Sequence, residues 1–345
     1  LEQLHKNLKS SEFLVQLAKI VALEESVYHS GHKNDYFADR FGGDVLTDTT
    51  ERSPTYCTPP FRKFDDATAS ESWAFLFLPQ AQTSDAWQNI LKREPRCVEW
   101  SKKEVRELVG EEKFSRTMET VRKISRAELM RFKIGLDGLP QRVLKKGDCA
   151  VAVLSETEKD SLLEPNGFFR IQLDAAQKAG AKVGTIYFGK SAVGRDLRLA
   201  GTLAPPIEEV FVPLPETDFL MDGVARVAVK LVMNTLSTCT MVRLGRVMGN
   251  YMIWVVPSNL KLIDRATRYI SKLTGLDYER ANRLLFEVIE YVEPRMKSDQ
   301  AYPPVVGVAV LRARENLTNE EAEKKLRQSN TFPKIDKDEN SHRQS

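Results

Sequence analysis

A strand–helix–strand pattern between residues 149 and 188 constrains the fold of this chain more than any other feature. Cys149–Leu154 is the clearest predicted strand of the sequence, and Lys182–Phe188 is predicted to form another. Between them, Phe168–Ala179 is predicted to form a helix that ends at Gly180, a residue that readily takes the left-handed conformation of helix ends. A helical crossover makes the two strands parallel. The sequence therefore predicts an α/β fold with a doubly wound, largely parallel sheet flanked by helices.

Other segments are predicted to extend this layered arrangement. Pro213 cannot donate a hydrogen bond to a neighbouring strand, so the segment that contains it is expected at an edge of the sheet. The further predicted strands are Ser26–His29, which the Ser30–Gly31 turn follows, Trp73–Leu78, Cys97–Trp100 and Val210–Leu214. Helices are predicted over Glu12–Leu23, from a cap at Thr83 or Ser84 to about Leu91, and over the strongly charged 102–131 segment.

Helical periodicity dominates from Asp222 onward. A helix that is buried on several sides is predicted to reach Met241, and Ser258–Leu273 is predicted to form another that Gly275 closes. Thr274–Leu285 and Glu315–Leu326 align as a weak internal repeat, and a capping residue opens the helix of each copy. Two copies are too few for a solenoid, so they predict a small α-helical C-terminal cap.

The composition argues against two classes of partner. The 345 residues contain 51 Lys and Arg against 48 Asp and Glu, and this balance gives no basic stripe for nucleic acid or another polyanion. No apolar run reaches the length of a membrane span, and the polar Leu1–Ser10 segment does not resemble a signal peptide. We therefore expect no nucleic acid and no membrane among the partners.

The cysteines and histidines indicate where the chain works. Only His29 and His32 lie close together, without a carboxylate–histidine helix motif, so neither a metal site nor a cofactor is expected. No cysteines form a CxxC pair, which indicates free thiols in a reducing compartment and a cytoplasmic location. The cysteines are Cys57, Cys97, Cys149 and Cys239.

Two segments near the carboxyl end of the chain carry a family resemblance. Lys230–Asn250 contains an MVRLG element, and Ser258–Ala266 reads SNLKLIDRA. Together they closely resemble the C-terminal half of N-acetylmuramic acid 6-phosphate etherases and the related second sugar isomerase (SIS) domain of glucokinase regulatory proteins. Upstream, the layout of Asp148–Gly184 and the ERSPTY sequence of Glu51–Tyr56 are similar to the same family. The resemblance implies a flavodoxin-like SIS domain.

The resemblance also implies an order of domains. The SIS domain is expected over residues 1–272, with 102–131 as a candidate insertion, and the helical cap over residues 273–332. The polar and charged residues 333–345 are expected to be a disordered tail.

Three loops depart from the etherase pattern. The GTSGR loop that follows the first strand of etherases corresponds to Ser30–Asn34, and their ASGRTP loop corresponds to Leu154–Lys159. Their STRLKAGT element corresponds to Leu220–Val227. Serine-rich loops bind phosphate through hydroxyl and backbone N–H groups, whereas Glu156 and Glu158 would repel a phosphate dianion. Similar erosion is a feature of the second SIS domain of glucokinase regulatory proteins, whose first domain holds the sugar phosphate.

The resemblance implies roles for three charged residues. Lys261 and Arg265 lie four positions apart on one helix face and correspond to residues that approach the sugar phosphate; a solvated basic face is the alternative. Glu51 occupies the position of the catalytic acid of etherases, which protonates the leaving lactate; a loop carboxylate that caps a helix is the alternative.

Four small residues are predicted to contact a sugar. Open α/β sheets bind ligands beyond the ends of their strands, and hydroxyl groups there suit a sugar. Plain turn residues are the alternative interpretation. The four residues are Ser30, Gly31, Ser155 and Thr157.

Three functions remain open from the sequence. The leading interpretation is a regulatory or non-catalytic domain that binds a phosphorylated hexose or amino sugar, resembles glucokinase regulatory protein and has a sugar kinase as partner. The alternative is an enzyme, either a lyase that cleaves the lactyl ether of N-acetylmuramic acid 6-phosphate or a sugar-phosphate isomerase. A third is a structural half that forms a homodimer or supports a second SIS domain. One fold hosts all three functions.

Overall fold

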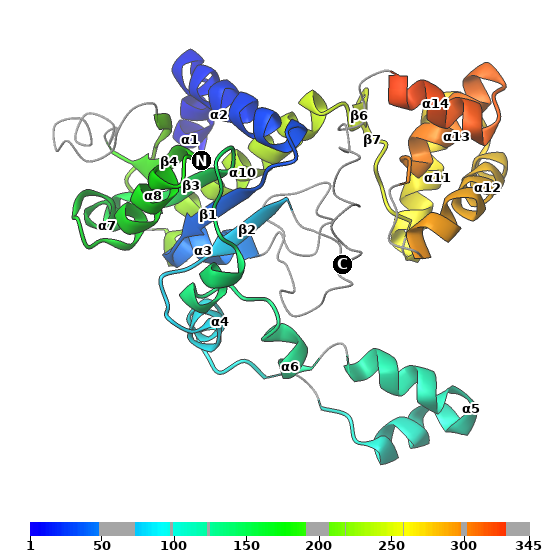
Figure 1. Cartoon of the computed structure of the whole chain (residues 1–345), viewed down its shortest axis with the longest axis horizontal. Coiled ribbons are helices and arrows are strands. Elements are labelled where there is room, and N and C mark those ends of the chain that lie inside the picture. Colours follow the sequence, from blue (N-terminus) through cyan, green and yellow to red (C-terminus); the bar gives the residue numbers. More distant parts are fainter. Residues whose placement is uncertain are drawn as a thin grey trace, which may run out of the picture. The chain divides into compact units, whose positions relative to one another are not determined.

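The computed structural model describes residues 1–47, 73–96, 99–122, 125–190, 207–217, 219–257, 259–297 and 302–328 (Figure 1). Contacts divide the chain into two compact units. The first unit lies within residues 1–16, 33–54 and 58–232, and the second lies within residues 17–32, 55–57 and 233–345.

The described residues form the following elements. The strands are β1 (Asn34–Ala38), β2 (Ala74–Phe77), β3 (Cys149–Ser155), β4 (Lys182–Gly189), β5 (Ile207–Pro213), β6 (Val247–Met248) and β7 (Tyr251–Met252). The helices are α1 (Glu2–Leu8), α2 (Ser11–His29), α3 (Arg40–Thr47), α4 (Thr83–Leu91), α5 (Lys102–Arg122), α6 (Arg126–Leu129), α7 (Asp160–Leu163), α8 (Phe168–Lys178), α10 (Gly223–Arg243), α11 (Leu260–Thr274), α12 (Tyr278–Lys297), α13 (Val305–Glu315) and α14 (Asn319–Gln328). Short 3-10 turns cover Leu136–Gln141, Glu156–Glu158 and Leu220–Asp222.

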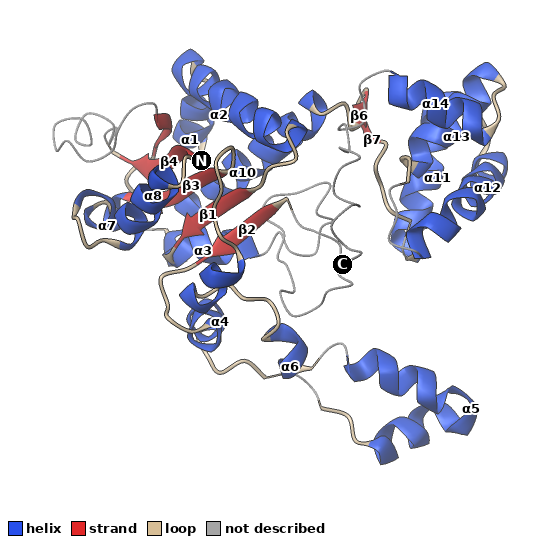
Figure 2. Cartoon of the chain, viewed as in Figure 1, coloured by secondary structure: helices blue, strands red, loops and turns tan. Residues whose placement is uncertain are grey.

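The first unit is built on a five-stranded parallel sheet with the order β2-β1-β3-β4-β5 (Figure 2). Every residue of β1, β2 and β3 is buried, as expected for strands with helices on both faces. This order is the flavodoxin-like arrangement of doubly wound sheets. The predicted α/β fold, with its largely parallel sheet and its C-terminal helices, is therefore confirmed.

Helix α8 shows how the sequence packs the sheet. Its buried residues Phe169, Leu173 and Ala176 are spaced by three or four positions, so they share one face. That face belongs to the same apolar core as Phe37 of β1 and Phe77 of β2. Burial of each such large apolar side chain stabilises the fold by about 1.5–3 kcal/mol.

The edge strand β5 is protected by amino-terminal residues of the same unit. The side-chain amide of Asn7 donates a hydrogen bond of 2.7 Å to the carbonyl oxygen of Pro213. The backbone N–H of Phe211 donates to Oε1 of Gln16 at 2.8 Å. These contacts occupy backbone groups that an exposed edge would offer to another strand.

The prediction of a first strand over Ser26–His29 is wrong, because these residues form the last turn of α2. Buried positions continue through this segment at helical spacing, and Val27 and Tyr28 follow Ile20 and Glu24 on one face. The true first strand is β1, which the sequence disguises because its first two residues are polar. Asn34 and Asp35 are nevertheless completely buried.

Two smaller predictions also need correction. Helix α4 begins where expected, but its N-cap position is Gln82, and the Thr83 hydroxyl instead donates a hydrogen bond of 2.7 Å to Asp137. Of the strand predicted over residues 97–100, Glu99 and Trp100 are not in a strand, and Cys97 and Val98 lie outside the described residues.

The charged 102–131 segment is helical, as predicted. It forms α5 and α6, and α5 bends at Gly110, whose φ of 73° breaks the helix. Val105 is buried, and the Arg106 guanidinium lies 4.2 Å from the centre of the Phe114 ring. Its interpretation as an insertion remains a prediction, as do the domain boundaries at residues 272 and 332.

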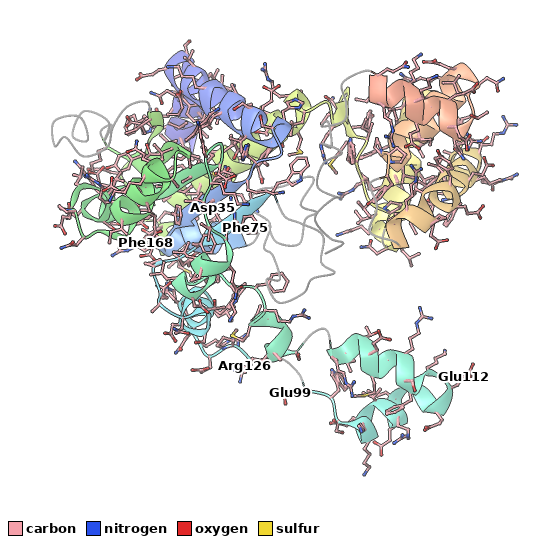
Figure 3. All side chains as sticks on the ribbon, viewed as in Figure 1. Asp35, Phe75, Glu99, Glu112, Arg126 and Phe168 are labelled. Carbon is pink, nitrogen blue, oxygen red and sulfur yellow. The ribbon has the colours of Figure 1, made fainter. Side chains whose placement is uncertain are left out.

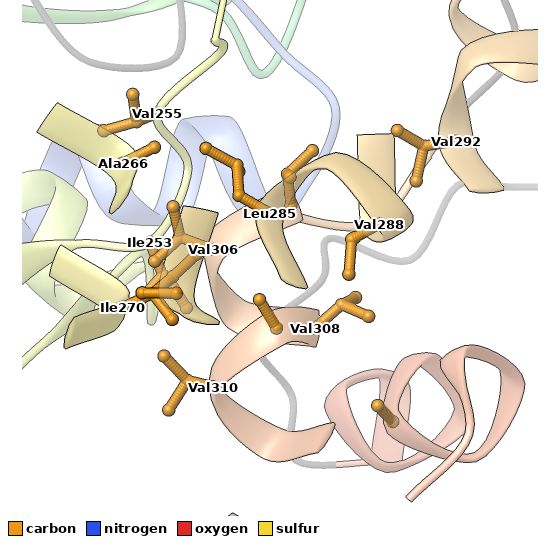
Figure 4. Packing of buried hydrophobic residues seen from close by; sticks show 14 of the residues in the cluster. Ile253, Val255, Ala266, Ile270, Leu285, Val288, Val292, Val306, Val308 and Val310 are labelled. Carbon is orange, nitrogen blue, oxygen red and sulfur yellow. The ribbon is translucent and has the colours of Figure 1, made fainter. Parts of the chain in front are cut away.

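The second unit contains the predicted helical repeat (Figure 4). Asp277 accepts a hydrogen bond of 2.8 Å from the N–H of Arg280, and Thr318 and Glu321 form the predicted reciprocal capping box. The aligned apolar residues of the two copies, Ala281 and Leu285 in α12 and Ala322 and Leu326 in α14, are buried in one core.

A buried carboxylate joins two of these helices. Glu323 of α14 accepts hydrogen bonds from Arg295 at 2.8 and 3.0 Å and from the Tyr291 hydroxyl at 2.7 Å, both on α12. Burial by itself would raise the pKa of Glu323, but the bonds from Arg295, Arg327 and Tyr291 lower it to about 2. The carboxylate therefore stays ionised and pairs α12 with α14 at neutral pH.

The two central strands of the sheet are tied together by a buried ion cluster. Arg142 Nε lies 3.0 Å from Oδ1 of Asp35, and Arg142 Nη1 lies 3.0 Å from Oδ2 of Asp148. Asp35 and the neighbouring Phe75 are labelled in Figure 3, and the guanidinium of Arg142 lies 5.1 Å from the centre of the Phe75 ring. Burial raises the pKa of Asp35 to about 7, against the attraction of Arg142.

We predict that Arg142→Met strongly destabilises the protein. The substitution leaves Asp35 in a buried strand without a cation, and the loss of one partner of a buried pair costs about 3–5 kcal/mol. Urea unfolding at neutral pH measures the change. Arg106→Met, which removes the exposed pair with Glu111, is the matched control and should change the free energy of unfolding by about 1 kcal/mol or less. Equal effects of the two substitutions would contradict the prediction.

Candidate functional site

Two cavities open at the carboxyl ends of the parallel strands in the first unit. The strand order reverses between β1 and β3, and open α/β sheets bind ligands beyond the carboxyl ends of strands at such a point. The first cavity has a volume of about 420 Å³, and the second has a volume of about 320 Å³. Thr157, which follows β3, and Asp222, which precedes α10, line both.

Charged residues of both signs line the first cavity. The carboxylates are Asp39, Asp44 and Asp222, and the cations are Arg40, Lys92 and Arg226. The neutral lining residues Gln80, Asn89 and Thr157 are also polar. The chain brings these groups together because β1, β2 and β3 all end at this edge of the sheet.

Some of these charges already have partners. Arg226 forms an ion pair with Asp44, and its Nε donates a hydrogen bond of 2.7 Å to the carbonyl oxygen of Met221. Lys92 Nζ donates to Oδ1 of Asn89 at 3.2 Å. By contrast, no side-chain hydrogen bond or ion pair within the described part of the chain engages Asp39, Arg40 or Asp222.

The turn after β3 holds a buried carboxylate. Oε2 of Glu158 accepts hydrogen bonds from the backbone N–H of Ser155 at 2.8 Å and from its hydroxyl at 2.6 Å. Oε1 of Glu158 is buried and has no hydrogen-bond partner among the described residues. Burial raises the pKa of Glu158 to about 7, against the bonds from Ser155; the charge of Asp39 raises it further and that of Arg40 lowers it.

This edge of the sheet is poorly suited to a phosphate dianion. The backbone N–H of Lys190, at the end of β4, donates a hydrogen bond of 2.8 Å to Glu156, and Lys190 Nζ is paired with Glu216. A side chain at Gly189 would collide with the Glu156 carboxylate, so the glycine allows this close approach. A carboxylate therefore occupies a backbone donor of the kind that phosphate would use.

The structure brings together only some of the residues predicted from the sequence. Ser155 and Thr157 lie at the strand-end cavities, but the Ser155 hydroxyl already bonds Glu158. Ser30 and Gly31 do not follow a strand, because they lie between the end of α2 and the start of β1. The Ser30 hydroxyl donates to the carbonyl oxygen of Ser26 at 2.8 Å, as expected for a residue that ends a helix. The premise that placed them at a strand end is wrong.

The other predicted residues lie elsewhere. Lys261 and Arg265 lie on α11 in the second unit, and Glu51 lies outside the described residues. Sequence analysis missed Asp39, Arg40 and Asp222 as residues of this cavity. Asp39 and Arg40 directly follow the buried strand Asn34–Ala38, but the strand that the sequence predicts here begins eight residues earlier and therefore does not point to them.

The described residues include no helix that is long and apolar enough to cross a membrane.

Comparison with known proteins finds similarity to one group of sugar-phosphate enzymes. No family model matches the sequence. The chain is 32% identical over 164 residues to an N-acetylmuramic acid 6-phosphate etherase 2 of Enterococcus faecalis, a match that covers 47% of this chain and 48% of the relative. It is 52% identical over 82 residues to an N-acetylmuramic acid 6-phosphate etherase of Bacteroides thetaiotaomicron, covering 23% and 28% of the two chains.

A third relative extends the same picture. An N-acetylmuramic acid 6-phosphate etherase of Prochlorococcus marinus is 49% identical over 61 residues, which is 18% of this chain and 19% of the relative. The matched segments thus span about half the length of these curated relatives at most. Together with the flavodoxin-like strand order, they give the chain a similarity to proteins named for a phosphorylated amino sugar.

We predict that Glu158→Gln flattens the dependence of stability on pH. The folded protein keeps the Glu158 proton up to about pH 7, whereas an unperturbed glutamate releases it near pH 4.5. This group therefore lowers the free energy of unfolding as the pH rises between those values. The variant should gain about 3 kcal/mol relative to the wild type over this range.

Urea unfolding at several pH values measures this gain. Glu164→Gln, an exposed position at the end of α7, is the control and should follow the wild type at every pH. A difference between Glu158→Gln and the wild type that stays constant with pH would contradict the assignment.

Proposed function

We propose that this chain binds a phosphorylated hexose or amino sugar through Lys261 and Arg265, as a regulatory or completing subunit rather than as a catalyst. The observation that carries the proposal is a separation of charge along the chain. Carboxylates occupy the strand-end loops at which a SIS-type domain would hold phosphate, whereas α11 keeps an uncommitted basic pair.

The surroundings of α11 support an anion site. Lys261 is exposed and Arg265 is half-buried, and no hydrogen bond or ion pair within the described residues engages either side chain. The adjacent carboxylate of Asp264 is occupied by Arg268 at 2.9 Å and by the Tyr278 hydroxyl at 3.0 Å. These bonds lower the pKa of Asp264 and use its acceptors, so it does not neutralise the basic pair.

The end of the helix adds to this charge. The side chain of Asn259 caps α11 by accepting a hydrogen bond of 3.0 Å from the N–H of Leu262. Lys261 therefore lies in the first turn of a 15-residue helix, where the helix dipole favours anions. The names of the similar proteins, which specify a 6-phosphate of an amino sugar, supply the class of ligand.

The regulatory part of the proposal follows from the strand-end loops. Asp39 and Glu156 would repel the phosphate of a substrate bound there. A subunit of this kind would present its basic pair to a sugar phosphate held by a second SIS domain or by another copy of the chain. It would signal the occupancy of that site to a partner such as a sugar kinase.

A lyase is the second candidate, and one observation favours it. Glu158 lies in the turn after β3 next to Ser155 and Thr157, which line a strand-end cavity, and burial raises its pKa to about 7, which suits a group that donates or accepts a proton at neutral pH. Turnover of N-acetylmuramic acid 6-phosphate by the wild type, with loss of that turnover in Glu158→Gln, would establish the lyase and remove the regulatory proposal.

We predict that Lys261→Ala reduces the stabilisation by phosphorylated sugars to about half or less. A ligand at 100 times its dissociation constant stabilises a protein by about 2.7 kcal/mol, and loss of a charged contact should weaken binding by about tenfold or more. Melting temperatures with a panel of hexose and amino-sugar phosphates, against the corresponding free sugars, measure this effect. Arg265→Ala should behave in the same way.

Lys272→Ala is the matched control for these two variants. Lys272 is an exposed lysine in the last turn of the same helix, so its removal changes the net charge equally. It should leave the shift in melting temperature unchanged. The proposal fails if no phosphorylated sugar stabilises the wild type, or if the control loses the shift as well.

A further inference from the structure

We propose that the buried cluster of Asp35, Arg142 and Asp148 is a pH-sensitive latch between the two central strands. The latch holds the amino ends of β1 and β3 together while the cluster keeps one proton, and it loosens them when that proton leaves. Asp35 is the second residue of β1, and Arg142 and Asp148 belong to the segment that leads into β3. The cluster lies within the first unit and contains no residue of the proposed sugar-phosphate site.

The latch depends on a count of charges in a buried place. Asp35 is 0% exposed, Asp148 is 3% exposed and Arg142 is 9% exposed. One guanidinium serves both carboxylates, at 3.0 Å from each. With both carboxylates ionised, the cluster would carry a net negative charge away from water, which is costly. Two carboxylates that share a site avoid this cost when one of them keeps its proton.

The hydrogen bonds of the cluster decide which carboxylate keeps the proton. Asp148 accepts the backbone N–H groups of Lys33 at 3.1 Å and of Lys145 at 2.9 Å, in addition to Nη1 of Arg142. Burial by itself would raise the pKa of Asp148, but these bonds and the charge of Arg142 lower it. Asp35 faces Arg142 alone, and its Oδ2 is buried without a hydrogen-bond partner among the described residues. Asp35 is therefore the group that carries the proton.

The elements packed around Asp35 leave its balance to this cluster. Asp35 pairs in register with Phe75 of β2, which Figure 3 labels beside it, and with Ala150 of β3. On α8, which packs against the same sheet, Arg170 is paired with Asp174 at 2.8 Å. The charges that act on Asp35 are those of Arg142 and Asp148. The titratable residues that flank these elements are half-buried or exposed, and they are His32, Lys33, Lys145, Lys146, Lys178 and Lys182.

The direction of the switch follows from the proton on Asp35. Burial raises the pKa of Asp35 to about 7; the charge of Arg142 opposes this rise and the charge of Asp148 adds to it. An unperturbed aspartate in the unfolded chain releases its proton near pH 3.8. The contribution of Asp35 to stability is therefore complete below pH 3.8 and is lost as the pH rises through about 7. Above that pH, two ionised carboxylates compete for one guanidinium, which weakens the contact between the strand starts.

The first experiment follows the Asp35 carboxyl group directly in the full chain. Protein with 13C in the aspartate carboxyl carbons is titrated by NMR between about pH 5 and 9. The signal that disappears in Asp35→Asn belongs to Asp35, and it should titrate near pH 7. A signal that is already that of an ionised carboxylate at about pH 5 would overturn the proposal.

The second experiment tests whether this proton controls the strands. The backbone N–H of Cys149 donates to the carbonyl oxygen of Lys33 at 2.9 Å, so its hydrogen exchange reports on the starts of β1 and β3. Between about pH 6 and 8, its protection should fall about tenfold more in the wild type than in Asp35→Asn, because asparagine cannot ionise. Glu158 titrates in both proteins, so its contribution cancels. Equal losses of protection in the two proteins would overturn the proposal.

Two further variants separate charge sharing from a general effect of lost charge. Asp85 is exposed on α4, so Asp85→Asn changes the net charge equally and should keep the pH dependence of the wild type. In Asp148→Asn, Arg142 serves Asp35 alone, so the NMR titration of Asp35 should move to lower pH by about one unit or more. A titration that stays near pH 7 in this variant would overturn the sharing of one guanidinium. Circular dichroism shows whether Asp148→Asn folds, and the exchange experiment decides the proposal if it does not.

Discussion

The guanidinium of Arg142 lies between Asp35 and Asp148 and sets where the two central strands begin. Asp148 also accepts the backbone N–H groups of Lys33, just before β1, and of Lys145, just before β3. Because β1 and β3 are parallel and paired from Asn34 with Cys149, the same contacts fix where the strands end. Asp39 and the Ser155–Glu158 turn consequently meet at one edge of the sheet.

The charged groups at the amino ends of the strands therefore differ from those at the carboxyl ends. At the amino ends of the strands, Arg142 pairs with two carboxylates, Asp35 and Asp148, in a buried network. At the carboxyl edge, Asp39 and Asp222 are uncommitted, and Glu158 is buried with one free oxygen. Ligands of open α/β sheets bind at the carboxyl ends of the strands, so these charged groups shape the binding chemistry of the first unit. The basic pair on α11 has no such carboxylate partners among the described residues, which is why we assign phosphate recognition to that helix.

Sequence patterns were reliable where burial produced a regular period. The apolar runs of β2, β3 and β4 and the repeat in α12 and α14 follow simple spacing, and each was predicted close to its observed bounds. The pattern failed at β1, because Asn34 and Asp35 are polar residues whose burial depends on Arg142 and other distant partners. Because the first strand is predicted too early, the sugar-binding residues are expected at Ser30 and Gly31, which do not follow a strand. The acidic character of the loop after β3, by contrast, follows directly from Glu156 and Glu158 in the sequence.

The sequence by itself determined the class of fold, the edge position of β5, the repeated helical cap and the acidic character of the loop after β3. These features depend on local spacing, on the missing N–H of Pro213 and on residues that are neighbours in the chain. Only the tertiary structure decided which residues share the cavity, because Asp39, Lys92 and Asp222 are far apart in the sequence and meet through the strand order. It also decided the protonation of Glu158 and Asp35, since burial is a property of the packed chain and not of any segment within it.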